Sequence, residues 1–296
     1  DATGTGLALL AGPDVLPAWR GGGGLTLHVA DKPFALYRKN TAGKRVLDQI
    51  IQQSTLIVDL HGGFGFGGIA DLGIVLPIAP VVVWGSAGGD FAVRGSDGPA
   101  VGDLTLIPKV QILNPSRTRF IGFGVQLPVT LPTGQKDSYL SDGGVNFAVD
   151  LLAELRVWKL RVLVNLSPIH VQPKFEYGDL ARQFGMDFGG GVSFQMLKAL
   201  ALRAEGWGSV SYVGAANKAS GEWAASVSMT PSDVVQFDLG FGTGIGGFAV
   251  PSVRAFAGLR ITAPNRKDTD GDGVNDREDG CLTEAEDRDG YKDEDG

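Results

Sequence analysis

The residues best suited to chemistry are aspartates near the C-terminal end of the chain. They recur at alternate positions, with a glycine where a calcium-binding loop turns sharply. This spacing offers three carboxylates, then a backbone carbonyl, then two further carboxylates, and Ca²⁺ takes roughly six to eight oxygen ligands. The sequence therefore predicts a Ca²⁺ site with these ligands: Asp268, Asp270, Asp272, Val274 through its carbonyl, Asp276 and Asp279.

A shorter acidic cluster follows, and we expect it to contribute to a second Ca²⁺ site: Asp287, Asp289, Asp293 and Asp295. Apolar residues that would build a core around these loops are almost absent, so this segment needs the ion to become ordered. The alternative is a solvated acidic tail, which the regular spacing disfavours.

Motifs for catalysis are not found. The three histidines are His28, His61 and His170, and none belongs to a His-Glu-x-x-His zinc motif. The chain contains neither a Gly-x-Ser-x-Gly nucleophile elbow nor a P-loop, and the glycine-rich stretch 64–68 resembles a strand with a tight turn. We therefore predict that the protein is not an enzyme, although a Ser–His pair assembled only in the folded chain stays open.

The elements that carry these residues are predicted by apolar residues at every second position, which is typical of strands. Such alternation runs through 120–132, 145–155, 160–166, 184–196, 222–229, 236–245 and 253–261. Short turns are expected near 66–68, 114–116, 157–158, 197–198 and 231–232. They alternate with longer loops near 37–45, 85–100, 132–142, 174–182, 214–220 and 246–251.

This alternation predicts an all-β fold, a transmembrane antiparallel β-barrel of about twelve strands from Gly23 to Thr262. The predicted strands, at roughly 10–15 residues, are long enough to cross a bilayer when tilted, whereas strands of soluble sandwiches are shorter. A soluble sandwich or a soluble lipid-binding barrel is the alternative. A helical membrane protein is disfavoured, because Pro77 and Pro80 interrupt the longest apolar run, 72–84.

If the apolar face of each strand meets lipid, the polar face lines the lumen. That inward set has mixed signs: Asp59, His61, Asp103, Lys109, Asp150, Glu154, Arg156, Lys159, Arg161, Arg203, Glu205, Asp238, Arg254 and Arg260. Mixed charges can cross-link a lumen through ion pairs, whereas an ion-selective pore more often carries one dominant sign. The net charge of −7, concentrated in the acidic segment, disfavours nucleic acid as a partner.

The predicted organisation has three parts: an N-terminal periplasmic segment at 1–22, a barrel at 23–263 and a calcium-binding linker at 264–296. The acidic segment resembles thrombospondin type-3 repeats, in which the aspartate pattern is followed by a cysteine, here Cys281. The layout as a whole resembles OmpA-like proteins, in which such repeats join an outer-membrane barrel to a periplasmic peptidoglycan-binding domain. We therefore expect a longer protein that continues beyond Gly296.

The resemblance implies a location in the bacterial outer membrane, with the C-terminal segment in the periplasm. The partners that it implies are outer-membrane lipid, a surface protein bound by the extracellular loops, and peptidoglycan bound through the further domain. The predicted function is a non-enzymatic envelope anchor, with adhesion or cell–cell outer-membrane exchange at its loops and a Ca²⁺-stiffened linker. The alternative is a channel or transporter for small molecules, which an open lumen would favour.

Overall fold

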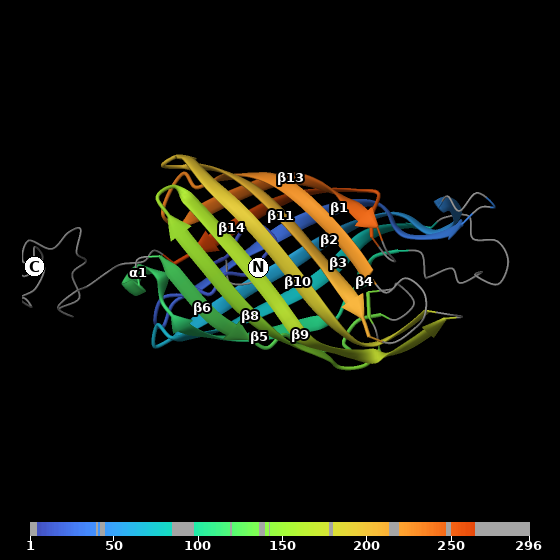
Figure 1. The fold of residues 1–296 in the computed structure, drawn as a ribbon, viewed down its shortest axis with the longest axis horizontal. Helices are drawn as coiled ribbons and strands as arrows, with labels where there is room; N and C mark the ends of the chain where they lie inside the picture. Colours follow the sequence, from blue (N-terminus) through green and yellow to red (C-terminus); the bar gives the residue numbers. More distant parts are fainter. Residues whose placement is uncertain are drawn as a thin grey trace, which may run out of the picture. The chain divides into compact units, whose positions relative to one another are not determined.

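Alternating apolar and polar residues form long antiparallel strands that close into a barrel (Figure 1). A computed structural model describes residues 5–39, 41, 45–84, 98–118, 120–135, 140–141, 143–177, 180–212, 219–246 and 250–263. The chain divides into units 1–262 and 263–296, and nearly all of the second lies outside the described residues. In the described ranges, no helix has the length and apolar character needed to cross a membrane.

In the part of the chain that the structure describes, fourteen strands form one sheet, and the one helix is short. The strands are β1 Gly21–Lys39, β2 Arg45–Phe66, β3 Ala70–Trp84, β4 Ala100–Val101, β5 Leu104–Leu113, β6 Ile121–Gln126, β7 Val129–Leu131, β8 Asn146–Val157, β9 Leu160–Tyr177, β10 Leu180–Leu197, β11 Leu200–Ser211, β12 Ala219–Met229, β13 Val235–Gly246 and β14 Val253–Thr262; the helix α1 is Pro115–Thr118.

Two strands far apart in the sequence close the barrel. β1 pairs antiparallel with β14, from Gly22 opposite Thr262 to Asp31 opposite Val253. β6 and β7 act as one strand interrupted at Leu127–Pro128, because proline has no N–H to donate to the ladder. With β4 as a short patch beside β3, the wall is a closed antiparallel barrel of 12 strands, the number predicted from the sequence.

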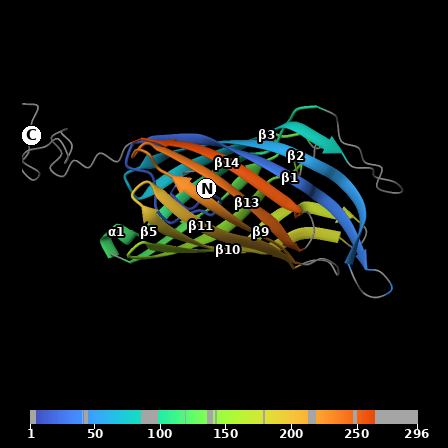
Figure 2. The ribbon, with the colours of Figure 1, turned by 90° about the horizontal axis from the view of Figure 1, so that it is seen from above.

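The two ends of the barrel differ in their connections (Figures 1 and 2). One end, the turn end, carries α1 and the short turns 67–69, 158–159, 198–199 and 230–234. At the other end, the loop end, lie the strand ends that are joined by 40–44, 85–99, 132–145, 178–179, 212–218 and 247–252. This asymmetry agrees with the predicted alternation of short and long connections. In outer-membrane barrels the short turns face the periplasm.

The outer face of the barrel is apolar. Val164 is 54% exposed and Leu239 67% exposed, and each lies beside an inward-facing polar neighbour on its strand. Near the turn end Trp158 is 86% exposed, packs its ring edge-on against Phe194 at 6.1 Å between ring centroids, and lies 5.5 Å from Lys159 Nζ. An exposed apolar band with aromatic residues at its border suits bilayer lipid and not water.

Three features differ from the sequence prediction. β9 and β10 continue through most of the predicted loop 174–182, leaving only 178–179 between them, and β1 and β2 shorten the predicted loop 37–45. Each strand of these hairpins is longer than the roughly 9–11 residues that a tilted strand needs to cross a bilayer. The third difference concerns residues 1–22, predicted to form a separate periplasmic segment. Residues 5–17 lie inside the barrel, and the exposed Ala18 and Trp19 lead at the turn end to β1, which begins at Gly21.

Candidate functional site

The lumen of the barrel holds a segment of the same chain. We call residues 5–20 the N-terminal plug. It contains no helix or strand, but Leu7 and Leu16 are fully buried at 0% and 1% exposure. At its end, Trp19 N–H donates to the Gly65 carbonyl at 2.9 Å, and Gly65 N–H donates to the Arg20 carbonyl at 2.9 Å. The plug therefore enters β1 at the turn end, next to β2.

Glu205 on β11 is the main anchor for the first half of the plug. Its carboxylate accepts the N–H groups of three consecutive residues, Ala8 at 3.1 Å, Leu9 at 3.0 Å and Leu10 at 2.8 Å. Backbone N–H groups inside a protein need such partners, because an unsatisfied buried donor costs about 1–3 kcal/mol. The buried Glu205 carboxylate thus supplies the hydrogen-bond acceptors that a neighbouring strand would supply in a sheet.

A second anchor joins β3, β5 and the plug. Lys109 Nζ lies 3.3 Å from an Asp71 carboxylate oxygen, and both side chains are almost fully buried. Asp71 also accepts the N–H of Leu16 at 3.1 Å, while Lys109 donates to the Thr5 hydroxyl at 2.8 Å. This ion pair therefore spans the plug from its first described residue to its last buried leucine.

Two arginines bind the plug from β8 and β9, Arg161 at its beginning and Arg156 at Asp14. Arg161 donates to the Gly6 carbonyl at 2.9 Å and to the Glu154 carboxylate at 3.0 Å. Arg156 pairs with both Glu154 and Asp14, and Gln111 donates to Asp14 at 3.0 Å. Acidic wall groups bind plug N–H groups and basic wall groups bind plug carbonyls, so the wall recognises the plug largely through its backbone.

Inward-facing glycines give the plug the room that it occupies. A Cβ added at Gly191 would lie 2.6 Å from Leu7 Cδ1, and one at Gly189 would lie 2.7 Å from Leu10 Cδ2. At Gly65 the added atom would lie 2.3 Å from the Pro17 carbonyl oxygen. Glycine in a strand weakens it unless a close neighbour requires the space. Here the close neighbour is the plug.

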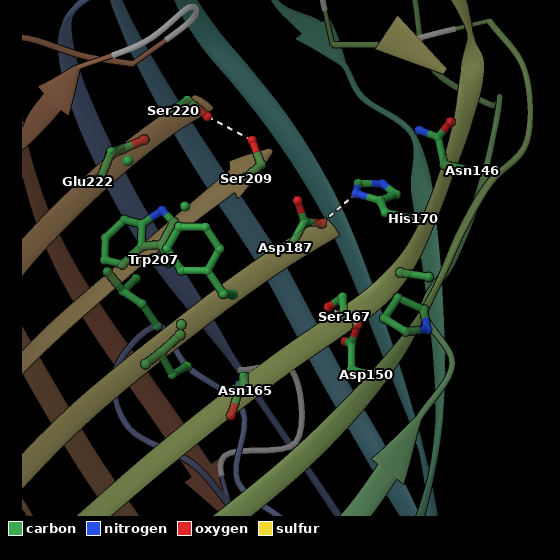
Figure 3. A pocket seen from close by; sticks show the side chains of 18 of the residues that line it. Asn146, Asp150, Asn165, Ser167, His170, Asp187, Trp207, Ser209, Ser220 and Glu222 are labelled. Carbon is green, nitrogen blue, oxygen red and sulfur yellow. Dashed lines mark hydrogen bonds and ion pairs between the residues drawn. The ribbon is translucent and has the colours of Figure 1, made fainter. Parts of the chain in front are cut away.

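A cavity of about 650 Å³ lies above the plug, toward the loop end (Figure 3). Leu9 and Leu10 contribute to its lining, together with polar side chains from β8 to β12 and β14. His170 pairs with Asp187, Asp150 accepts from Ser167 and from Gln126 at 2.7 Å, and Ser209 and Ser220 lie 2.7 Å apart. Glu222 is bound by two nitrogens of Arg254, at 2.9 and 3.2 Å.

The His170–Asp187 pair offers the orientation that a catalytic base needs. The contact found at His170 Nε2 is the Gln172 amide, at 3.1 Å. Ser167, its nearest serine in the sequence, donates to Asp150. Ser209 and Ser211 line a small pocket together with His170 and Asp187, so the Ser–His pair that the sequence left open stays open.

The inward-facing charges were largely predicted correctly. The predicted residues that face the plug or the cavity are Asp150, Glu154, Arg156, Arg161, Glu205 and Arg254. Further inward pairs are His28–Asp59 at 2.9 Å, Arg203–Asp238 at 2.8 Å and the longer Arg260–Asp238 contact. His61 contacts Thr26 at 3.3 Å, and Asp103 accepts the Gly134 N–H at 2.9 Å. Lys159 is an exception: it is exposed in the turn beside Trp158.

Four acidic residues of the lumen were absent from the predicted inward set. The strand alternation already placed Asp187 and Glu222 on the polar face, so a signal for them was present. Asp71 follows a glycine turn, and Asp14 lies in a stretch without periodicity. The sequence therefore contained no signal that either residue faces the lumen. The predicted calcium ligands between Asp268 and Asp295 lie outside the described residues, where no metal cluster is described or excluded.

The comparisons with known proteins identify the type of fold. The chain is similar to an outer membrane channel from Pseudomonas putida F1, with a TM-score of 0.62 and 16% identity over 84% of this chain and 97% of that one. It is also similar to the NanC porin, with a TM-score of 0.52 and 6% identity over 80% of this chain and 98% of that one. Neither the comparison with protein families nor that with curated sequences gives a match.

The chain has the fold of an outer-membrane β-barrel. At these identities the likeness shows the architecture and not the activity. The OmpA-like layout, the thrombospondin-like repeats and a role in adhesion or exchange receive no support from these relatives, so they stay predictions from the sequence. The barrel, its apolar outer face and its plugged lumen are the features on which a function can be built.

Proposed function

We propose that this barrel is an outer-membrane channel for small molecules, held closed in this conformation by its own N-terminal plug. The observation that carries the proposal is how the lumen is filled. A separate segment, bound largely through its backbone, occupies the half of the lumen toward the turn end. The channel function named for the Pseudomonas putida protein agrees with this proposal, but it belongs to that protein.

A barrel that served only as an anchor would have no need for this arrangement. Bulky wall residues would close it permanently, whereas Gly65, Gly189 and Gly191 leave the space that the plug fills. The wall groups that bind the plug are charged, so water can solvate them when the plug leaves the lumen. Displacement of the plug would therefore open a polar path without unfolding the wall, and the cavity would be the entrance to that path.

Conductance across planar bilayers tests this proposal. We expect the full chain to show small, infrequent currents, and a variant lacking residues 5–16 to show currents at least several-fold larger, because the wall alone leaves the lumen open. Retained heat-modifiable mobility on gels would establish that the variant is folded. A folded variant that conducts no more than the full chain would contradict the channel proposal and favour an anchoring role.

We also propose that the acidic segment binds Ca²⁺ through Asp268, Asp270, Asp272, Asp276 and Asp279. The support is the spacing of the carboxylates, which repel one another unless a divalent cation joins them. We expect limited proteolysis to cleave after about residue 264 only when a chelator removes Ca²⁺, while the barrel stays intact because its strands close on themselves. Identical cleavage with and without chelator would refute calcium-dependent ordering.

A further inference from the structure

We infer that the cavity above the plug is a binding site for a small, uncharged, polyhydroxylated solute of the mono- or disaccharide class. The inference rests on the proposed channel function, whose substrate class it names. A cavity of about 650 Å³ lies within the range of roughly 300–1,000 Å³ typical of small-molecule sites. Its lining combines hydroxyl, amide and charged groups with one indole ring (Figure 3).

The charged groups of the cavity are already engaged with the protein. Arg254 binds both oxygens of Glu222, His170 pairs with Asp187, and Asp150 accepts from a hydroxyl and an amide. Engaged charges do not require a counter-ion from the ligand, but their remaining lone pairs and N–H groups can still bind hydroxyls. A hydroxyl is both donor and acceptor, so it suits a lining in which both kinds of group alternate.

One polar atom of the lining still needs a donor. Within the part of the chain that the structure describes, Asn165 Oδ1 is buried and has no hydrogen-bond partner. Asn165 lines the cavity between Leu163, which is fully buried, and Ser167. A buried acceptor without a donor is unfavourable, and a ligand hydroxyl would supply the missing donor once the Asn165 amide turns toward the cavity.

An aromatic surface lies on the same part of the wall as Asn165, because Gly189 on β10 pairs with Asn165 on one side and with Trp207 on the other. Figure 3 places Trp207 on the wall that also carries Ser209, Ser220 and Glu222. Trp207 is part-buried and packs against the cluster of Ala8, Ala224 and Phe256. The apolar C–H face of a sugar ring can lie on such a ring while its hydroxyls reach polar groups on either side.

Other ligand classes fit this lining less well. It carries three carboxylates, Asp150, Asp187 and Glu222, against the single guanidinium of Arg254, so a sugar acid would meet repulsion. A long apolar ligand would desolvate the serine and asparagine side chains without offering them partners, at a cost for each such group. The chemistry therefore favours a neutral, hydroxyl-rich solute.

The test is calorimetric titration of the full chain in detergent with sucrose, glucuronate, choline and octanol. We expect sucrose alone to bind well. Asn165→Ala and Ser209→Ala should each weaken its binding by about tenfold, the loss expected for one well-made hydrogen bond of about 1.4 kcal/mol. Ser228→Ala is the matched control, since Ser228 is a buried lumen serine near the turn end and outside the cavity lining, and should leave sucrose binding unchanged.

Preferred binding of choline, glucuronate or octanol would overturn the inference, and so would sucrose binding that Asn165→Ala and Ser209→Ala leave unchanged. Absence of sucrose binding overturns it as well. The channel proposal is judged separately by conductance. A chain that conducts after plug removal but does not bind sucrose loses only the substrate class, whereas a chain that binds sucrose but never conducts loses the channel function.

Discussion

Replacing Lys109 by methionine should release the N-terminal plug from the lumen. The substitution leaves the buried Asp71 carboxylate without its cationic partner, and breaking one side of a buried ion pair costs about 3–5 kcal/mol. The barrel can relieve that cost by letting the plug leave and water reach Asp71. We therefore expect residues 5–20 to become susceptible to proteinase K in the K109M variant while the strands stay protected, and we expect larger bilayer currents.

The matched control is the double variant Lys109→Met with Asp71→Asn. It leaves no unpaired charge in the buried site, and the asparagine side-chain oxygen can still accept the N–H of Leu16. The double variant should therefore protect residues 5–20 far better than K109M. If K109M alone leaves the plug as protected as in the unchanged chain, the ion pair does not hold the plug. If both variants lose protection equally, the effect comes from lost packing and not from the charge.

Replacing Val164 by arginine should lower the free energy of unfolding by about 2–4 kcal/mol, the cost of an arginine facing lipid near the middle of a bilayer. Val164 lies on the exterior at 54% exposure, between the inward-facing Leu163 and Asn165 on β9. Urea unfolding in lipid vesicles, followed by tryptophan fluorescence, measures the change.

Val164→Phe is the control for this substitution. It changes the size of the same side chain but keeps it apolar, so we expect the free energy of unfolding to change by less than about 0.5 kcal/mol. A harmless Val164→Arg would mean that this face does not meet lipid, which would contradict the membrane barrel itself. Equal losses in both variants would point to lateral packing and not to the lipid environment.

The wall of the barrel could be predicted because its signal is local. Side chains alternate between the two faces of a strand. About ten residues of sequence are therefore enough to predict which face of a strand meets lipid and which faces the lumen. Val164 and its neighbours show this directly, and Glu205, Lys109 and Arg161 were placed inward by parity alone. Where parity was weak, as at Asp71 after a glycine turn, the inward residue was missed.

The partners of those inward residues could not be predicted in the same way. Which carboxylate meets which base depends on strand register, barrel closure and what fills the centre. Lys159 shows this limit. The alternation of side chains places it on the lumen face, but it lies in the turn between β8 and β9, beside Trp158. The cavity depends still more on assembly, because β8 to β12, β14 and the plug all contribute to its lining.

The amino-acid sequence by itself determined that this chain forms a barrel wall with an apolar exterior and a charged interior, since period-two patterning acts over neighbouring residues. Only the tertiary structure decided that the interior is closed by residues 5–20. That segment has no periodicity, and its backbone hydrogen bonds go to side chains far along the chain, such as Leu10 to Glu205 across 195 positions. Its place is determined by scattered wall charges and glycines, which converge on the segment only after the strands have paired and the barrel has closed.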